Sequence, residues 1–255
     1  MKAKVNGTEL YYEIHGKRGT SWLVLSHSLA CNVRMWDPQV EAFKGSHCIL
    51  NYDMRGHGQS AAPSGPYTLD MLADDVLALM KECGVERATF IGLSIGGMIG
   101  QTLALRGNAP FDKMVLADTT HTQSPEMLKS WDDRIGIAKS KGMKALVPAT
   151  LERWFTPAFR DKPEAQKIAA IIAATPVNGF VGCGEAIKKL NTTARLKEIK
   201  LPVLAITGES DAAAGGTRYI GENVPGAKFV SIANASHIAN VEQPEKFNQA
   251  LREFL

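Results

Sequence analysis

Apolar and polar positions follow two patterns that alternate along the chain, one typical of buried strands and one typical of helices. Strands are predicted where short apolar runs occur, at residues 22–26, 47–53, 88–91, 113–117, 202–207 and 228–232. Between these runs, apolar residues recur with a helical period, most clearly at 69–83, where Thr68 can cap the helix and Gly84 can end it. Strands that alternate with helices predict an α/β fold, with a mostly parallel sheet covered by helices on both faces.

The two ends of the chain extend this pattern. Residues 2–15 predict a hairpin that turns at Asn6-Gly7, because apolar and polar positions alternate after the turn. A helix that begins at Pro244 closes the chain, and its period predicts that Phe247, Leu251 and Phe254 face inward.

The alternation of strand and helix patterns stops between residues 119 and 199. This segment has no clear strand pattern, and its helical patterns are broken repeatedly by proline and glycine. We therefore predict a core domain formed by residues 1–118 and 200–255, with residues 119–199 inserted as a helical cap.

Charge, cysteine spacing and apolar content indicate which kinds of partner and which cellular compartment to expect. A net charge of +3 spread evenly over 255 residues argues against binding to nucleic acid or to a membrane surface. The four cysteines have no paired spacing, and the N-terminal segment lacks the apolar run of a signal peptide. The longest apolar run, 168–174, is shorter than the roughly 20 residues that span a bilayer. We expect a reduced, cytoplasmic protein.

The clearest chemical motif is Gly92-Leu93-Ser94-Ile95-Gly96, which lies between a predicted strand and a predicted helix. Strand, tight turn and helix are the context of a nucleophile elbow, in which the glycines leave room for neighbouring backbone. The helix N-terminus would also favour an oxyanion beside the serine. We therefore predict that Ser94 is a nucleophile. The alternative is an ordinary glycine-rich loop.

A serine nucleophile needs a base, and the base needs an orienting acid. In the chain order serine, acid, histidine, only His237 comes late enough to be the base, unless it merely caps the last helix. Asp211 follows the predicted strand 202–207 and is our choice of acid, with Asp118 as the alternative. The two oxyanion N–H donors are predicted to be Ile95, after the nucleophile, and Leu29, in the loop after strand 22–26.

With these residues placed, the full chain resembles the α/β-hydrolases, and more closely the 3-oxoadipate enol-lactonases. The matching segments are 25–29, 35–39, 52–58, 65–69, 92–101, 150–157, 174–176 and 240–245. The matches inside the insertion are the most informative, because caps differ most between subfamilies. The resemblance implies a cofactor-free hydrolase that opens a lactone ring. No metal is implied, since the histidines share no ligand spacing.

Three positions depart from that family near the expected pocket. His27 and Asp118 stand where the family usually has asparagine, and residues 212–216 are smaller than the usual segment after the acid. These changes affect the expected substrate more than the fold. Relatives of this sequence type also include broad esterases and lactonases that act on acyl-homoserine lactones.

The resemblance implies a substrate with a carboxylate, so a cationic group should face the pocket. Trp131 and Arg134 share a helix face, and Trp154 lies in a second cap segment next to Arg153. We expect Trp131, Arg134 and Trp154 to contact the substrate. The alternative is a surface arginine that pairs with Asp132 or Asp133, and tryptophans buried in the cap.

The sequence thus predicts a hydrolase of a small lactone or carboxylic ester, and it leaves the oligomeric state open. An aspartate at the elbow would be needed for a dehalogenase or epoxide hydrolase, and Ser94 excludes both. Peroxide could replace water in the same site. A different class is a ligand-binding protein that turns over slowly, against which the intact Ser94, Asp211 and His237 argue.

Overall fold

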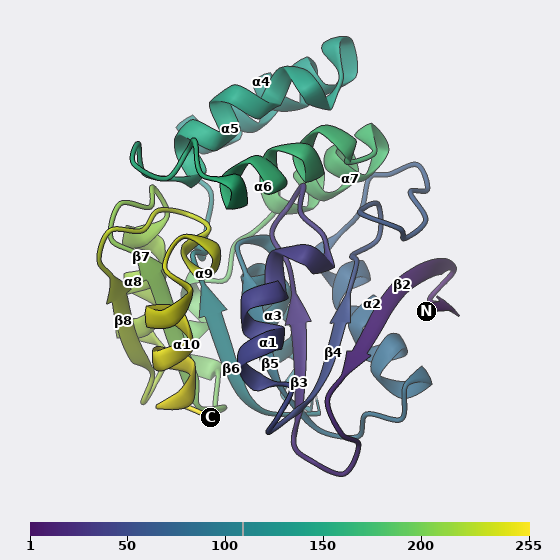
Figure 1. Cartoon of the computed structure of the whole chain (residues 1–255), viewed down its shortest axis with the longest axis vertical. Helices are drawn as coiled ribbons and strands as arrows, with labels where there is room; N and C mark the ends of the chain where they lie inside the picture. Colours follow the sequence, from purple (N-terminus) through teal and green to yellow (C-terminus); the bar gives the residue numbers. More distant parts are fainter. Residues whose placement is uncertain (109) are drawn as a thin grey trace.

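The computed structural model describes residues 1–108 and 110–255. Its centre is an eight-stranded sheet in the order β1-β2-β4-β3-β5-β6-β7-β8 (Figure 1). The pairings β1–β2 and β2–β4 are antiparallel, and all the others are parallel, as predicted. The strands are β1 (Lys2–Val5), β2 (Thr8–His15), β3 (Trp22–Ser26), β4 (Cys48–Tyr52), β5 (Ala88–Leu93), β6 (Phe111–Ala117), β7 (Val203–Gly208) and β8 (Lys228–Ile232).

Helices cover both faces of the sheet because the central strands β4 to β7 are almost wholly apolar and buried. In Figure 1, α1 (Asp37–Phe43) and α10 (Pro244–Arg252) lie in front of the strands. Behind them lie α2 (Leu69–Glu82) and α8 (Ala214–Asn223), and α3 (Ile95–Leu105) packs between α2 and strands β5 and β6. The side chain of Thr68 accepts a hydrogen bond from the Met71 N–H, which confirms the predicted cap of α2.

Four helices lie over the carboxyl ends of the parallel strands, at the top of Figure 1. They are α4 (Pro125–Lys141), α5 (Val147–Trp154), α6 (Pro163–Ala174) and α7 (Val177–Lys188). The short 3₁₀ helix η2 (Met143–Leu146) lies between α4 and α5, and a second one, η3 (Thr193–Glu198), lies between α7 and β7. The segment 119–199 is thus helical, as its sequence indicates. The boundaries of a separate cap domain stay a prediction.

A short 3₁₀ helix, η1 (Val33–Trp36), precedes α1, and the Asn32 side chain caps it by accepting the Arg34 N–H. The closing helix differs from the sequence-based expectation in one respect. The last helix ends at Arg252, so Phe254 lies beyond it and is half-buried, whereas Phe247 and Leu251 are fully buried as expected.

Two buried histidines hold the loop that follows β3. His27 Nε2 accepts the Met54 N–H at 3.0 Å, so its Nδ1 carries the proton and donates to the Ser28 carbonyl at 2.7 Å. His57 Nε2 likewise accepts the Ala30 N–H at 3.0 Å, and its Nδ1 donates to the Arg55 carbonyl at 3.1 Å. Both rings must be neutral to accept these bonds, because a protonated imidazole has no acceptor.

Burial explains why both rings stay neutral. Desolvation, and then the nearby His57, lower the pKa of His27 to about 3, and desolvation lowers the pKa of His57 to about 4. In the unfolded chain both would titrate near their ordinary value of about 6.5. Below that value the unfolded state therefore binds more protons than the folded state does. The two neutral rings make their full contribution to the free energy of unfolding above about pH 6.5, and this contribution is lost as the pH falls towards about 3 to 4.

We predict that His27→Asn flattens the pH dependence of stability. The free energy of unfolding of the wild type should fall more steeply between pH 6 and pH 4 than that of the variant, by up to roughly 3 kcal/mol over this range. Urea unfolding at a series of pH values measures the difference. His15→Asn, at a half-buried histidine of β2 that lies 2.9 Å from Glu13, is the comparison variant and should change the slope less than His27→Asn does. A constant offset between wild type and His27→Asn at every pH would contradict the prediction.

Candidate active site

Ser94 sits in a strained turn between β5 and α3. Its backbone lies at φ 58° and ψ −116°, a conformation that side-chain-bearing residues rarely adopt. A Cβ at Gly92 would lie 2.2 Å from the Gly96 carbonyl oxygen, and one at Gly96 would lie 2.2 Å from the Ser26 carbonyl oxygen. Both glycines are therefore required by close backbone contacts, as the sequence predicts, and the turn presents the Ser94 side chain above the sheet.

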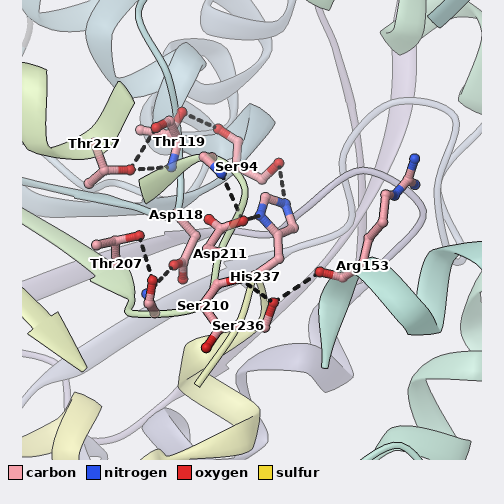
Figure 2. A network of polar contacts seen from close by, with 12 residues as sticks. Ser94, Asp118, Thr119, Arg153, Thr207, Ser210, Asp211, Thr217, Ser236 and His237 are labelled. Carbon is pink, nitrogen blue, oxygen red and sulfur yellow. Dashed lines mark hydrogen bonds and ion pairs between the residues drawn. The ribbon is translucent and has the colours of Figure 1, made fainter. Parts of the chain in front are cut away.

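Three predicted residues from separate segments meet at this turn. His237 Nε2 lies 3.0 Å from Ser94 Oγ, and His237 Nδ1 lies 3.0 Å from Asp211 Oδ1 (Figure 2). The distances fit a relay in which the imidazole faces the serine on one side and the carboxylate on the other. The same Asp211 oxygen accepts the Ala213 N–H at 3.0 Å, which helps to fix the carboxylate.

The loop that carries His237 is itself anchored. The Ser236 N–H donates to Glu242 Oε2 at 2.8 Å, and the Ser236 hydroxyl donates to the Arg153 carbonyl at 3.0 Å. The ring of Trp154 lies 5.8 Å from the imidazole, between centroids. The helices above the sheet therefore contribute to the position of the histidine, and Trp154 lines the cavity beside it.

Asp118, the alternative acid, lies at the end of β6 but makes no hydrogen bond to the imidazole. Its Oδ1 accepts the Gly208 N–H at 2.7 Å. It is fully buried, and burial followed by the negative charge of Asp211 raises its pKa well above the ordinary value of an aspartate. Of the two candidate acids, only Asp211 faces His237.

Two backbone N–H groups near Ser94 have no acceptor in the part of the chain that the structure describes. One belongs to Ile95, the first residue of α3, whose N–H cannot bond within the helix. The other belongs to Leu29, in the loop held by His27 and His57. Leu29 and Ser94 line the same cavity. The side chain of His27 does not line it, because its ring points to the end of β4.

The cavity above Ser94 has a volume of about 360 Å³. Much of its wall is apolar and comes from α3 and the overlying helices: Met98, Met127, Trp131, Met143, Trp154, Ile172, Phe180 and Ile187. Ile172 is buried among the overlying helices and also reaches the cavity. The small residues Ala212 and Ala213 complete the wall beside Asp211, in the segment that departs from the enol-lactonase pattern.

Two arginines line the same cavity. Arg134 is half-buried, its guanidinium lies 3.5 Å from the centroid of the Trp131 ring, and its Nε donates to the Ser130 carbonyl. Arg153 is exposed to solvent, although protein atoms surround it on several sides. Desolvation, and then the charge of Arg153, lower the pKa of Arg134 to about 9, and desolvation lowers the pKa of Arg153.

Arg134 forms no ion pair with Asp132 or Asp133, its expected alternative partners, in the part of the chain that the structure describes. Asp132 pairs with Lys188 at 2.6 Å, and among the described residues neither cavity arginine forms an ion pair with a carboxylate. Trp131 is both a cavity wall and a buried residue that packs near Phe180, so the two readings of its role are compatible.

Several contacts around the cavity could not be predicted from the sequence. Arg153 and the three methionines stand on helices whose period does not reveal which buried face meets the cavity. The imidazole of His121 stacks on Tyr219 with ring centroids 4.2 Å apart, and its Nδ1 lies 2.7 Å from Thr193 Oγ1. No signal in the local sequence indicates that pairing.

The described residues contain no cluster of three or more His, Cys, Asp or Glu side chains arranged to hold a metal ion. Among them, no single helix has the length and apolar character to cross a membrane; α6 and α7 reach that threshold only when taken together, as a pair bent by 96°.

Comparison with known proteins agrees with the fold. Residues 21–244 match the family described as alpha/beta hydrolase fold. The chain is 33% identical over 246 residues to 3-oxoadipate enol-lactonase 2 of Acinetobacter baylyi, which covers 95% of this chain and 91% of that protein.

Solved structures give the same result. The enol-lactonase from Burkholderia xenovorans LB400 has a TM-score of 0.94 at 38% identity, over 100% of this chain and 99% of that one. A thermophilic esterase from Thermogutta terrifontis, solved with malate bound, has a TM-score of 0.92 at 25% identity, over 99% and 97% of the two chains. Together with the family match over most of the chain, these similarities establish that the protein belongs to the α/β-hydrolase family.

Proposed function

We propose that the protein is a serine hydrolase of lactones or carboxylic esters that works through an acyl-enzyme and is most like a 3-oxoadipate enol-lactonase. The observation that carries this proposal is the continuous relay from Ser94 Oγ through the His237 imidazole to Asp211 Oδ1, with both contacts at 3.0 Å. Similarity to enol-lactonases over nearly the whole chain supports the same reaction class.

In the first step, Ser94 Oγ attacks the carbonyl carbon of the lactone while His237 Nε2 takes the hydroxyl proton. Asp211 holds the imidazole with Nδ1–H towards its own Oδ1 and stabilises the imidazolium that forms. The imidazolium then gives its proton to the ring oxygen of the lactone as the C–O bond breaks. The acyl group stays on Ser94, and because the substrate is cyclic the alcohol remains attached to it.

Water completes the reaction. His237 takes a proton from a water molecule, and the oxygen attacks the acyl carbon and displaces Ser94 Oγ, which recovers its proton from the imidazolium. Each attack makes a tetrahedral oxyanion, and the N–H groups of Leu29 and Ile95 are placed to donate to it. A donor of this kind is typically worth about 3 kcal/mol in the transition state.

The arginines of the cavity favour an anionic substrate. Arg134 and Arg153 bring two positive charges to the wall of the site, and neither is neutralised by a neighbouring carboxylate among the described residues. A carboxylate on the substrate would form charge-assisted hydrogen bonds with them, while Trp131 and Trp154 pack against its apolar part. The named activity of the enol-lactonase relatives fits such a substrate.

Two other readings are tested by the same experiments. A broad carboxylesterase or an acyl-homoserine lactonase would use the same Ser94 relay on neutral substrates, for which the apolar cavity wall has room. A ligand-binding protein with slow turnover would keep the fold but show little hydrolysis that depends on Ser94. A cytoplasmic location and a small-molecule substrate without any cofactor remain part of the proposal.

We predict that Ser94→Ala abolishes turnover. Removing the nucleophile should lower kcat by about 10⁴-fold or more, because the remaining site can only bind and polarise the substrate. Hydrolysis of 3-oxoadipate enol-lactone and of p-nitrophenyl acetate measures the effect. Ser210→Ala, at an exposed serine next to Asp211, is the control and should stay within about threefold of the wild type. Unchanged turnover in Ser94→Ala would rule out this mechanism.

We predict that Arg134→Gln slows the hydrolysis of anionic substrates but not that of neutral ones. Loss of a charge-assisted hydrogen bond should lower kcat/KM for the enol-lactone by about 10- to 100-fold and leave p-nitrophenyl acetate nearly unchanged. Arg153→Gln should show the same preference. Arg87→Gln, before β5 at the opposite end of the sheet, is the control. Equal losses on both substrates, or faster turnover of a long-chain acyl-homoserine lactone by the wild type, would contradict the assignment of an anionic substrate.

A further inference from the structure

Asp118 is a fully buried carboxyl group that the proposed reaction does not use. Its backbone lies at φ 44°, in the left-handed region, directly after β6. Its Oδ1 accepts the Gly208 N–H at 2.7 Å. Its Oδ2 is buried and has no hydrogen-bond partner among the described residues. A buried oxygen without a partner is costly, so its surroundings need an explanation.

Asp211, like Asp118, has one carboxylate oxygen that accepts hydrogen bonds and one that has no partner among the described residues. Its Oδ1 accepts from His237 Nδ1 and the Ala213 N–H, but its Oδ2 is also buried and without a partner among the described residues. The two aspartates are tied to one residue, because Gly208 donates its N–H to the Asp118 side chain and its carbonyl accepts the Asp211 N–H at 3.1 Å. Both line the same cavity, and Figure 2 shows them together beside His237.

The charges around Asp118 do not favour its ionised form. The groups that face it are Thr207 and Gly208 of β7, Ala239 of α9 (Ala239–Glu242), and Asp211 with its partner His237. No lysine or arginine forms an ion pair with it among the described residues. Hydrogen bonding by the backbone of Gly208 and Ala239 and by Thr207 lowers the pKa of Asp118, but burial and then the negative charge of Asp211 outweigh it and raise this pKa well above its ordinary value. Two ionised carboxylates in this space would repel each other without a compensating cation.

We propose that Asp118 carries a proton and is a positioning residue for Asp211, to whose Oδ2 it donates an O–H···O hydrogen bond from its own Oδ2. This bond gives both unpartnered oxygens a partner, and it leaves the pair with a single negative charge, on the acid that faces His237. The bond also fixes the second oxygen of Asp211, so that its first oxygen stays directed at Nδ1. The inference rests on the proposed role of Asp211 in orienting His237.

Infrared spectroscopy of the protein labelled with ¹³C-aspartate tests the protonation without any substrate. At neutral pH the wild type should show the C=O stretch of a protonated carboxylic acid, and this band should be lost in Asp118→Asn. Asp112→Asn, at an exposed aspartate, is the control and should keep the band. A wild-type spectrum without such a band, or one that Asp118→Asn leaves unchanged, would overturn the proposal.

A second variant keeps the test valid if Asp118→Asn folds poorly. Asp211→Asn removes the negative charge beside Asp118, so the protonated band should titrate at lower pH than in the wild type, by about one unit or more. An unchanged titration would show that the two carboxyl groups do not interact.

Kinetics tests the positioning role. Asparagine can still donate to Asp211 and accept from Gly208, so Asp118→Asn should keep kcat/KM within about threefold, whereas Asp118→Ala should lower kcat by about tenfold or more with little change in KM. Equal losses in both variants would contradict a hydrogen-bonding role. If the hydrolase proposal fails, turnover will survive Ser94→Ala. The infrared spectrum would still report whether Asp118 carries a proton, because that measurement needs no substrate.

Discussion

The site depends on one close backbone contact, between the turn after β5 and the end of β3. Gly96 lies against the Ser26 carbonyl so tightly that a methyl group has no room. This contact brings the first N–H of α3 and the loop that contains Leu29 to the same point above the sheet, with Ser94 between them. The strain at Ser94 persists because strand, helix and neighbouring loop all hold the turn in place.

Around this contact, the supports are buried polar groups rather than surface charges. Neutral histidines hold the loop after β3, Glu242 and the Arg153 carbonyl hold the loop of His237, and Gly208 joins the two aspartates. The bonds from Ala30 to His57, from Ser236 to Arg153 and from Gly208 to Asp118 join segments that lie far apart in the sequence. A substitution at any one of them therefore alters the geometry of the site without touching a substrate.

Much of this arrangement could be predicted because the relevant signals are local. The Gly-x-Ser-x-Gly turn, the position of His237 after the last strand and the sequence around Asp211 each depend on a few adjacent residues. The cavity wall could not be predicted in the same way. Ile172 and Arg153 lie on helices whose period marks a buried or exposed face but not the neighbour that the face meets. The stacking of His121 on Tyr219 joins residues that no sequence pattern connects.

The exposed position of Arg153 has a consequence for the rate of the proposed hydrolysis. A cation at the mouth of a cavity attracts anions over a distance of about one Debye length and speeds their encounter with the site. Hydrolysis of a lactone that carries one carboxylate gives a product that carries two. The same arginines therefore attract the product more strongly than the substrate. For an anionic lactone, release of the product then competes with chemistry as the slow step, and added salt accelerates departure while it slows arrival.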